Sequence, residues 1–279
     1  MKALIPAAGH GTRFAPFTKL VPKEMLPIGA RPAIALIVDE AIEAGADEIV
    51  IITSPEKPLL KKWFELEPPK VKITWVDQLE QRGLGHAVLQ AKDAILSPTS
   101  TQDPNSERDN RVLILLGDAL VSGGNASAAM MKVSQSNGNA SVIGCEQVPQ
   151  ERVSRYGIMK PKGDATRAEA VRPTQPKAFL SRDEENYHHF QLADIVEKPA
   201  IEEAPSNLAV AGRYLLDPEI FAYLTTQTPG KGGEIQLTDA IRRMLADKPV
   251  YGYIYPGHRH DIGNPAGYLK ALEAMDGNG

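Results

Sequence analysis

A glycine turn that directly follows an apolar run is the feature that most constrains this chain. Residues 3–5 (Ala-Leu-Ile) predict a short buried strand, and the loop after it, residues 6–13, reads Pro-Ala-Ala-Gly-His-Gly-Thr-Arg. A strand that breaks into such a turn directs several backbone N–H groups into one concavity, which suits phosphate oxygens. Gly9 and Gly11 let the backbone approach a ligand closely. Taken alone, the Gly-x-Gly pair is explained equally well by a plain tight turn.

Two common nucleotide-binding motifs do not match this loop. The dinucleotide fingerprint needs a third glycine where the chain has Phe14, and the sequence Gly-x-x-x-x-Gly-Lys-[Ser/Thr] occurs nowhere. Instead, three cations follow the turn: Arg13, Lys19 and Lys23. Arginine can bind phosphate through two parallel hydrogen bonds, and lysine acts as a point charge. The loop therefore predicts a triphosphate site without a Walker lysine.

A longer stretch around the loop resembles a known family. Residues 5–14, then Thr18 and Lys19, then residues 22–27 (Pro-Lys-Glu-Met-Leu-Pro) are similar to the signature of bacterial UTP–glucose-1-phosphate uridylyltransferases. These belong to the sugar-1-phosphate nucleotidyltransferases. Ala15 stands where the pattern usually has leucine. The resemblance runs from residue 2 to residue 272, with two polar interruptions.

Composition narrows the class of protein. Of 279 residues, 42% are hydrophobic and 24% charged, as in ordinary soluble globular proteins. A net charge of −4 argues against a general nucleic-acid binder, whose surface is basic. An anion site must therefore be local. The resemblance implies a single nucleotidyltransferase domain over residues 1–279, with a nucleotide-binding half of about 1–150 and a sugar-binding half of about 151–279.

The single cysteine and the absence of long apolar runs indicate in which cell compartment the protein is expected. Cys145 lies in a strand-like run, so we expect a packed thiol rather than a nucleophile. No apolar run approaches the ~18 residues of a membrane helix. Met1 and Lys2 lead directly into the first strand, which leaves no room for a signal peptide. We expect a cytoplasmic protein that binds neither membranes nor nucleic acid.

Strand-like and helix-like segments alternate through the first half of the chain. Such alternation predicts an α/β fold with a mostly parallel sheet and helices on both faces, in which ligands bind beyond the carboxyl ends of the strands. The resemblance implies the Rossmann-like, nucleotide-diphospho-sugar transferase type with a strand-rich second half. Strands are predicted over 48–52, 71–76, 112–116, 140–146, 191–197, 208–216 and 250–255, and helices over 33–44, 55–64, 86–95, 125–136, 217–225, 235–246 and 265–275. The polar segments 97–111 and 160–187 receive no function, and we expect residues 277–279 to be frayed.

Residues 77–87 join a predicted strand to a predicted helix. A plain loop with glycines for turning would explain them, but the resemblance implies a uracil-binding loop in which Gln78 reads the base. An amide offers one donor and one acceptor, which suits the imide face of uracil or thymine. His86 is interpreted as a residue at the start of the helix. The nucleotide-binding residues implied by the resemblance are Ala7, Ala8, Gly9, Gly11, Gln78 and Gly83.

Asp118 follows the most apolar predicted strand and a glycine. It could be a helix cap or could hold Mg²⁺ between nucleotide phosphates. The resemblance favours metal binding and adds Asp261, after the last predicted strand, as the second ligand. His258 and His260 form a His-x-His sequence that could indicate zinc, but with no clustered cysteines we favour Mg²⁺ as the cofactor.

Glu197 and Lys198 end a strand-like run in the second half. They could be a salt bridge of little energetic value. The resemblance instead implies a sugar-phosphate subsite, where Glu197 accepts from sugar hydroxyls, Lys198 holds the phosphate, and Gly157 and Gly212 bring the backbone close. Thr238 and Asp239 match the family pattern too, and we interpret them as residues that cap or open the following helix.

The resemblance implies an enzyme that makes UDP-glucose and pyrophosphate from UTP and glucose 1-phosphate. The implied reaction proceeds by in-line attack of the sugar phosphate on the α-phosphate. Arg13 and Lys23 are the implied catalytic cations, and no general base is needed because the sugar phosphate is largely a dianion at neutral pH. A homo-oligomer, dimer or tetramer, is also implied. Two alternatives are a thymidylyltransferase that uses dTTP and a catalytically silent regulatory relative.

Overall fold

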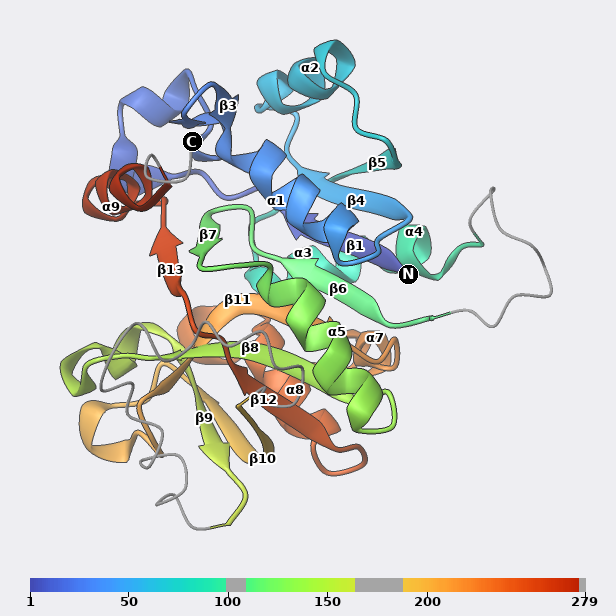
Figure 1. Ribbon diagram of the computed structural model, residues 1–279, viewed down its shortest axis with the longest axis vertical. Coiled ribbons are helices and arrows are strands. Elements are labelled where there is room, and N and C mark those ends of the chain that lie inside the picture. The colour runs from blue at the N-terminus through green and yellow to red at the C-terminus, as the bar shows by residue number, and fades with distance from the viewer. Residues whose placement is uncertain (99–108, 164–187, 276–279) are drawn as a thin grey trace.

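One nine-stranded sheet organises the computed structural model, which describes residues 1–98, 109–163 and 188–275. Helices cover both faces of the sheet (Figure 1). From one edge to the other the strands are β5 (Lys72–Asp77), β4 (Glu48–Thr53), β1 (Lys2–Pro6), β6 (Val112–Leu115), β11 (Leu208–Leu216), β8 (Ser141–Gln147), β12 (Val250–Ile254), β10 (His189–Glu197) and β9 (Gly157–Pro161).

The direction of the strands confirms the expected fold class. Strands β5, β4, β1 and β6 pair in parallel, as do β8 and β12. Within the described strands of this sheet, only β11 and β10 run against this direction, so seven of the nine point the same way. Every residue of β4 is buried, which explains its continuous run of β-branched side chains.

The two faces of the sheet carry separate apolar cores. One core packs α1 (Ala33–Glu43), α2 (Pro58–Leu66), α5 (Ala126–Ser136) and α9 (Pro265–Met275) against the sheet. The other packs α3 (Leu84–Gln90), α4 (Lys92–Leu96), α7 (Ile220–Thr225) and α8 (Leu237–Met244). Because both faces are covered, the loops at the ends of the strands are left for ligand binding.

A buried arginine connects the middle of the sheet to the helix layer. Arg213, on β11, is fully buried, and its guanidinium binds Glu40 of α1 at 2.7 and 2.9 Å. The same group donates to the carbonyl oxygen of Ala119 at 2.8 Å. Buried charges are stable only when they are paired and hydrogen-bonded, as here. This network holds the backbone that directly follows Asp118.

A short ribbon outside the main sheet brings the middle of the chain beside a segment near its C-terminal end. Strands β7 (Ala119–Ser122) and β13 (His258–Asp261) pair in antiparallel fashion, with Asp261 opposite Ala119. Figure 1 shows β13 running from the sheet toward α9. The sequence did not predict either strand, and it placed Asp261 after the last strand rather than at the end of one. That placement was wrong because a four-residue polar strand leaves no apolar pattern.

Other boundaries differ from the predictions in small ways. The helix predicted over residues 86–95 is two helices, α3 and α4, which meet at Ala91. The segment predicted as polar from residue 160 begins later, because β9 continues to Pro161. Two residue pairs, Pro27–Ile28 and Arg31–Pro32, form the small ribbon β2–β3. Most of the two polar segments, residues 99–108 and 164–187, and the end of the chain from residue 276 lie outside the described residues.

Cys145 is a packed thiol, as expected. Its side chain is fully buried on β8, and its Sγ donates to the carbonyl oxygen of Tyr253 at 3.3 Å. Burial raises the pKa of this thiol far above its usual value, which disfavours the reactive thiolate. Among the helices of the described residues, none has the length and apolar character to cross a membrane.

Candidate active site

Short 3₁₀ turns arrange the basic residues after the glycine loop. Gly11 has a φ of 66°, in the left-handed region that glycine favours, and the hydroxyl of Thr18 donates to its carbonyl oxygen at 2.9 Å. Arg13 lies in the turn Thr12–Phe14, and Lys23 lies in the turn Lys23–Met25. A Cβ built on Gly9 would lie 3.6 Å from the Lys23 Nζ atom. The Lys23 side chain therefore reaches back over the glycine loop.

Two carboxylates from distant parts of the chain meet these cations. Lys23 Nζ binds Asp118 Oδ2 at 2.5 Å, and Arg13 Nη1 binds Asp261 Oδ2 at 3.0 Å. Arg13, Asp261 and Asp118 surround the backbone of Gly263. A Cβ built there would lie 2.7 Å from Arg13 Nη2, 2.9 Å from Asp261 Oδ1 and 3.2 Å from Asp118 Oδ2. The two predicted catalytic cations and the two predicted metal ligands thus form one charged cluster beside the glycine loop.

The charges in this cluster stabilise one another. Burial alone would raise the pKa of Asp118, but the charge and hydrogen bond of Lys23, with the charges of Arg259 and Arg13, hold it below its usual value. Burial alone would lower the pKa of Lys23, but the negative charges of Asp118 and Glu24 outweigh burial and raise this pKa. Both groups are therefore charged at neutral pH. The outlying cation of the sequence motif, Lys19, is exposed.

The loop predicted to read the base has internal contacts of its own. Gln78 is 5% exposed, and its amide nitrogen lies 3.1 Å from His86 Nδ1. His86 lies in the first turn of α3, as expected. Gly83 packs against the segment before α8, where a Cβ would lie 2.7 Å from the carbonyl oxygen of Ile235. The structure thus gives Gly83 a packing reason to be glycine, and contact with a base stays a prediction.

The predicted sugar subsite is a compact group on β9, β10 and α8. Glu197 Oε2 accepts a hydrogen bond from Thr238 Oγ1 at 2.7 Å, and Glu197 Oε1 lies 3.1 Å from Lys198 Nζ. Gly157 pairs with Glu197 across the strands, and a Cβ on it would lie 3.4 Å from the carboxylate. Gly212 lies apart from this group, against Leu116, the residue that follows β6.

Thr238 was assigned only to the start of a helix, and that assignment was incomplete. It lies in the first turn of α8, but Gln236 is the N-cap, and the Gln236 side chain makes no capping hydrogen bond. The hydroxyl of Thr238 instead fixes the Glu197 carboxylate. No sequence pattern distinguishes a threonine that caps a helix from one that donates across to another strand.

Comparison with known proteins decides the family. A family model described as nucleotidyl transferase matches residues 2–277. The chain belongs to this family. The relatives agree: a UTP–glucose-1-phosphate uridylyltransferase of Staphylococcus haemolyticus (strain JCSC1435) is 40% identical over 292 residues, which cover 96% of this chain and 90% of the relative. The resemblance stated from the sequence is confirmed.

Solved structures agree with this nucleotidyl transferase in fold. A UDP-glucose pyrophosphorylase complexed with UDP-glucose has a TM-score of 0.81 and 33% identity, and the match covers 100% of this chain and 99% of that one. A UTP-bound UGPase from Acinetobacter baumannii has a TM-score of 0.74 and 32% identity, with 98% and 92% covered. The expected Rossmann-like nucleotidyltransferase fold is confirmed.

Arg259 of this nucleotidyl transferase, two residues before Asp261, is not among the site residues predicted from the sequence. Its side chain is 11% exposed, its Nε lies 3.3 Å from Glu146 Oε1, and its guanidinium stacks over the Tyr156 ring at 4.7 Å. Tyr156 also accepts the backbone hydrogen bond of Lys198 at 2.9 Å. Arg259 thus connects the predicted sugar subsite to the charged cluster, where its charge acts on Asp118. The sequence shows only that Arg259 stands between two histidines, a pattern that does not indicate its distant partners.

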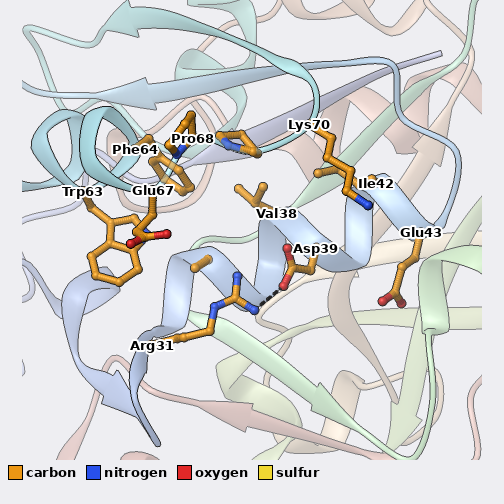
Figure 2. Close-up of a pocket in the computed structure, with 12 residues that line it drawn as sticks. Arg31, Val38, Asp39, Ile42, Glu43, Trp63, Phe64, Glu67, Pro68 and Lys70 are labelled. Carbon is orange, nitrogen blue, oxygen red and sulfur yellow. Dashed lines mark hydrogen bonds and ion pairs between the residues drawn. The ribbon is translucent and has the colours of Figure 1, made fainter.

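A hollow of about 420 Å³ lies elsewhere on the nucleotidyl transferase, between α1 and α2 (Figure 2). Val38, Trp63 and Phe64 contribute apolar surface, and Arg31 binds Asp39 across its edge at 2.5 Å. None of the predicted site residues lines it. The charged cluster beside the glycine loop and this hollow are therefore separate features.

Proposed function

We propose that the chain is a UTP–glucose-1-phosphate uridylyltransferase, which makes UDP-glucose and pyrophosphate. The observation that carries the proposal is the cluster of Arg13, Lys23, Asp118 and Asp261 beside a glycine loop at the carboxyl end of β1. Relatives at about 40% identity carry this activity in their names, and one solved neighbour holds UDP-glucose. The division into a nucleotide half and a sugar half, a homo-oligomeric state and a cytoplasmic location remain predictions.

The acidic pair fits a divalent cation, and we propose Mg²⁺. Asp118 and Asp261 direct carboxylate oxygens to one place beside Gly263, and hard oxygen donors suit Mg²⁺. No group of three histidine, cysteine or acidic side chains that could hold a metal occurs in the described ranges. Two carboxylates completed by substrate phosphates are the usual arrangement for Mg²⁺. When bound, the ion would neutralise charge on the triphosphate.

The two cations have distinct tasks in this proposal. Lys23 lies over Gly9 and would stabilise negative charge on the α-phosphate during attack. Arg13 is exposed enough to follow the leaving pyrophosphate, on which charge develops. Both cations are paired with carboxylates in this structure. A bound metal and triphosphate would separate these pairs, because the carboxylates would bind the metal and the cations would bind phosphate.

The sugar phosphate is the nucleophile, so no side chain has to remove a proton. Its second pKa of about 6 leaves it largely dianionic at neutral pH. What the protein must supply is alignment of that phosphate with the α-phosphorus. Lys198 would hold the dianion, and Glu197, fixed by Thr238, would accept from the sugar hydroxyls.

Pyrophosphate release tests the proposal directly. The purified protein is given UTP with glucose 1-phosphate, and in parallel dTTP with glucose 1-phosphate. We expect UTP to be preferred. Preference for dTTP would favour a thymidylyltransferase, which the amide of Gln78 alone does not exclude. Binding of both substrates without release of pyrophosphate would indicate a silent relative.

Replacement of Arg13 separates binding from catalysis. Because the charge that Arg13 stabilises grows in the transition state, Arg13→Ala should lower kcat by about a hundredfold and change the KM for UTP much less. Arg31→Ala is the matched control, since Arg31 is also ion-paired and is 48% exposed against 56% for Arg13. Steady-state kinetics with varied UTP measure the difference. A rise in KM with unchanged kcat would restrict Arg13 to substrate binding.

A further inference from the structure

Two side chains from neighbouring loops, neither of them part of the charged cluster, hold the glycine loop in place. Lys57, in the loop after β4, donates from Nζ to the carbonyl oxygen of Ala7 at 2.6 Å. Gln81, in the loop after β5, donates from Nε2 to the carbonyl oxygen of Ala8 at 2.5 Å. Strands β5, β4 and β1 are adjacent in the sheet, so three successive loops meet here. Two consecutive peptide groups of the nucleotide loop are thereby fixed.

The direction of a carbonyl determines the direction of the N–H in the same peptide group. A peptide group is planar and trans, so its N–H points away from its C=O. The bond from Lys57 to Ala7 therefore orients the N–H of Ala8, and the bond from Gln81 to Ala8 orients the N–H of Gly9. In the described part of the chain neither N–H has a hydrogen-bond acceptor. Both are available to a phosphate.

Lys57 is held firmly enough for this task. Its side chain is 9% exposed, and Nζ binds both carboxylate oxygens of Glu24, at 3.0 and 3.1 Å. Glu24 is 1% exposed and directly follows the catalytic candidate Lys23. Burial raises the pKa of Glu24 and lowers that of Lys57, and the opposite charge of each partner counteracts this change. The pair thus joins the glycine loop to the turn that carries Lys23.

We propose that Lys57 and Gln81 are positioning residues for the triphosphate. They turn the carbonyl groups of Ala7 and Ala8 away from the ligand, so that the N–H groups of Ala8 and Gly9 face its oxygens. This inference rests on the proposed use of UTP, but it concerns phosphate recognition alone. Without these anchors either peptide group can rotate and present a carbonyl oxygen to an anion, which repels it.

The test compares affinities for ligands with and without phosphate. Lys57→Met alone would leave Glu24 buried and unpaired, so the main variant is Lys57→Met with Glu24→Gln. We expect its Kd for UTP, measured by calorimetry without sugar, to rise about tenfold or more, and that of Gln81→Ala two- to tenfold. Uridine binding should be unchanged in both variants, and the KM for glucose 1-phosphate should stay within about twofold. Lys57→Arg keeps a charged donor and should recover most of the affinity.

A second buried pair provides the control for stability. Lys2 Nζ donates to the carbonyl oxygen of Ala94 at 2.6 Å and lies 3.3 Å from Glu48, with side chains 3% and 6% exposed. It lies at the opposite end of the same strands. Lys2→Met with Glu48→Gln should lower Tm as much as the main variant does and leave the Kd for UTP unchanged.

Several outcomes would overturn the proposal. These are an unchanged Kd for UTP in the main double variant or in Gln81→Ala, an equal loss of uridine binding, and an equal rise in Kd in the Lys2 control. If the main double variant does not fold, Gln81→Ala still decides, because its expected loss of UTP affinity does not depend on that variant. Inorganic pyrophosphate serves as a second probe, because its binding reports on the loop even where wild-type protein makes no UDP-glucose. Failure of the proposed function is thus distinguished from failure of this inference.

Discussion

Asp118→Asn is expected to lower kcat by about a thousandfold, equivalent to about 4 kcal/mol of transition-state stabilisation, while the protein stays folded. The amide keeps the shape of the side chain and still accepts a hydrogen bond from Lys23, so little stability is lost. It removes the negative charge that a divalent cation needs. Because Asp261 lies in the same cluster, Asp261→Asn should have a comparable effect. Steady-state kinetics with a Mg²⁺ titration measure both.

A matched carboxylate shows whether the effect is specific to the cluster. Asp194 is 29% exposed against 27% for Asp118, and it is likewise bound to a cation, Arg242, at 2.7 Å. Asp194→Asn should change kcat less than twofold. Activity of Asp118→Asn within tenfold of wild type would remove Asp118 from the metal site. Recovery of chelated wild-type enzyme by zinc as well as by Mg²⁺ would instead favour the pair His258 and His260.

The part of the site next to the parallel strands could be predicted from sequence. A buried strand such as β1 or β6 has a strong apolar pattern in the sequence. The polar or glycine residue that follows this pattern marks the carboxyl end of the strand. This reasoning places Asp118 and the glycine loop at the same edge of the sheet. The family resemblance added Asp261, which no local pattern relates to Asp118.

The remaining parts depend on contacts that leave no periodic pattern. The ribbon β7–β13 has four residues in each strand, and its second strand is polar, so it carries too little signal to be predicted. Hydrogen bonds from Lys57 and Gln81 to backbone carbonyl groups can be formed by side chains of many kinds and spacings. Their partners become known only when the loops are placed beside one another in the sheet. The same holds for Arg259, whose partners are distant in sequence.

Replacement of Glu197 and of Lys198 should impair the sugar side of the reaction in different ways. Lys198→Met removes a cation beside the attacking dianion, so kcat/KM for glucose 1-phosphate should fall by more than about a hundredfold. Glu197→Gln keeps the shape and the contact with Thr238 but loses a charged acceptor, which is worth roughly 1.5–3 kcal/mol, or ten- to hundredfold. Discrimination among hexose 1-phosphates should also relax, because the acceptor that reads the hydroxyl groups is weaker.

Nucleotide affinity decides whether these two residues belong to the sugar subsite. The Kd for UTP, measured without sugar, should be nearly unchanged in both variants. Lys61→Met is the control for loss of an exposed ion-paired lysine, since Lys61 is 41% exposed against 43% for Lys198 and lies 3.5 Å from Asp77. If the pair were only a surface salt bridge, both variants would behave like this control, because such pairs contribute about 0–1 kcal/mol. An equal loss of UTP affinity would assign Glu197 and Lys198 to the nucleotide side instead.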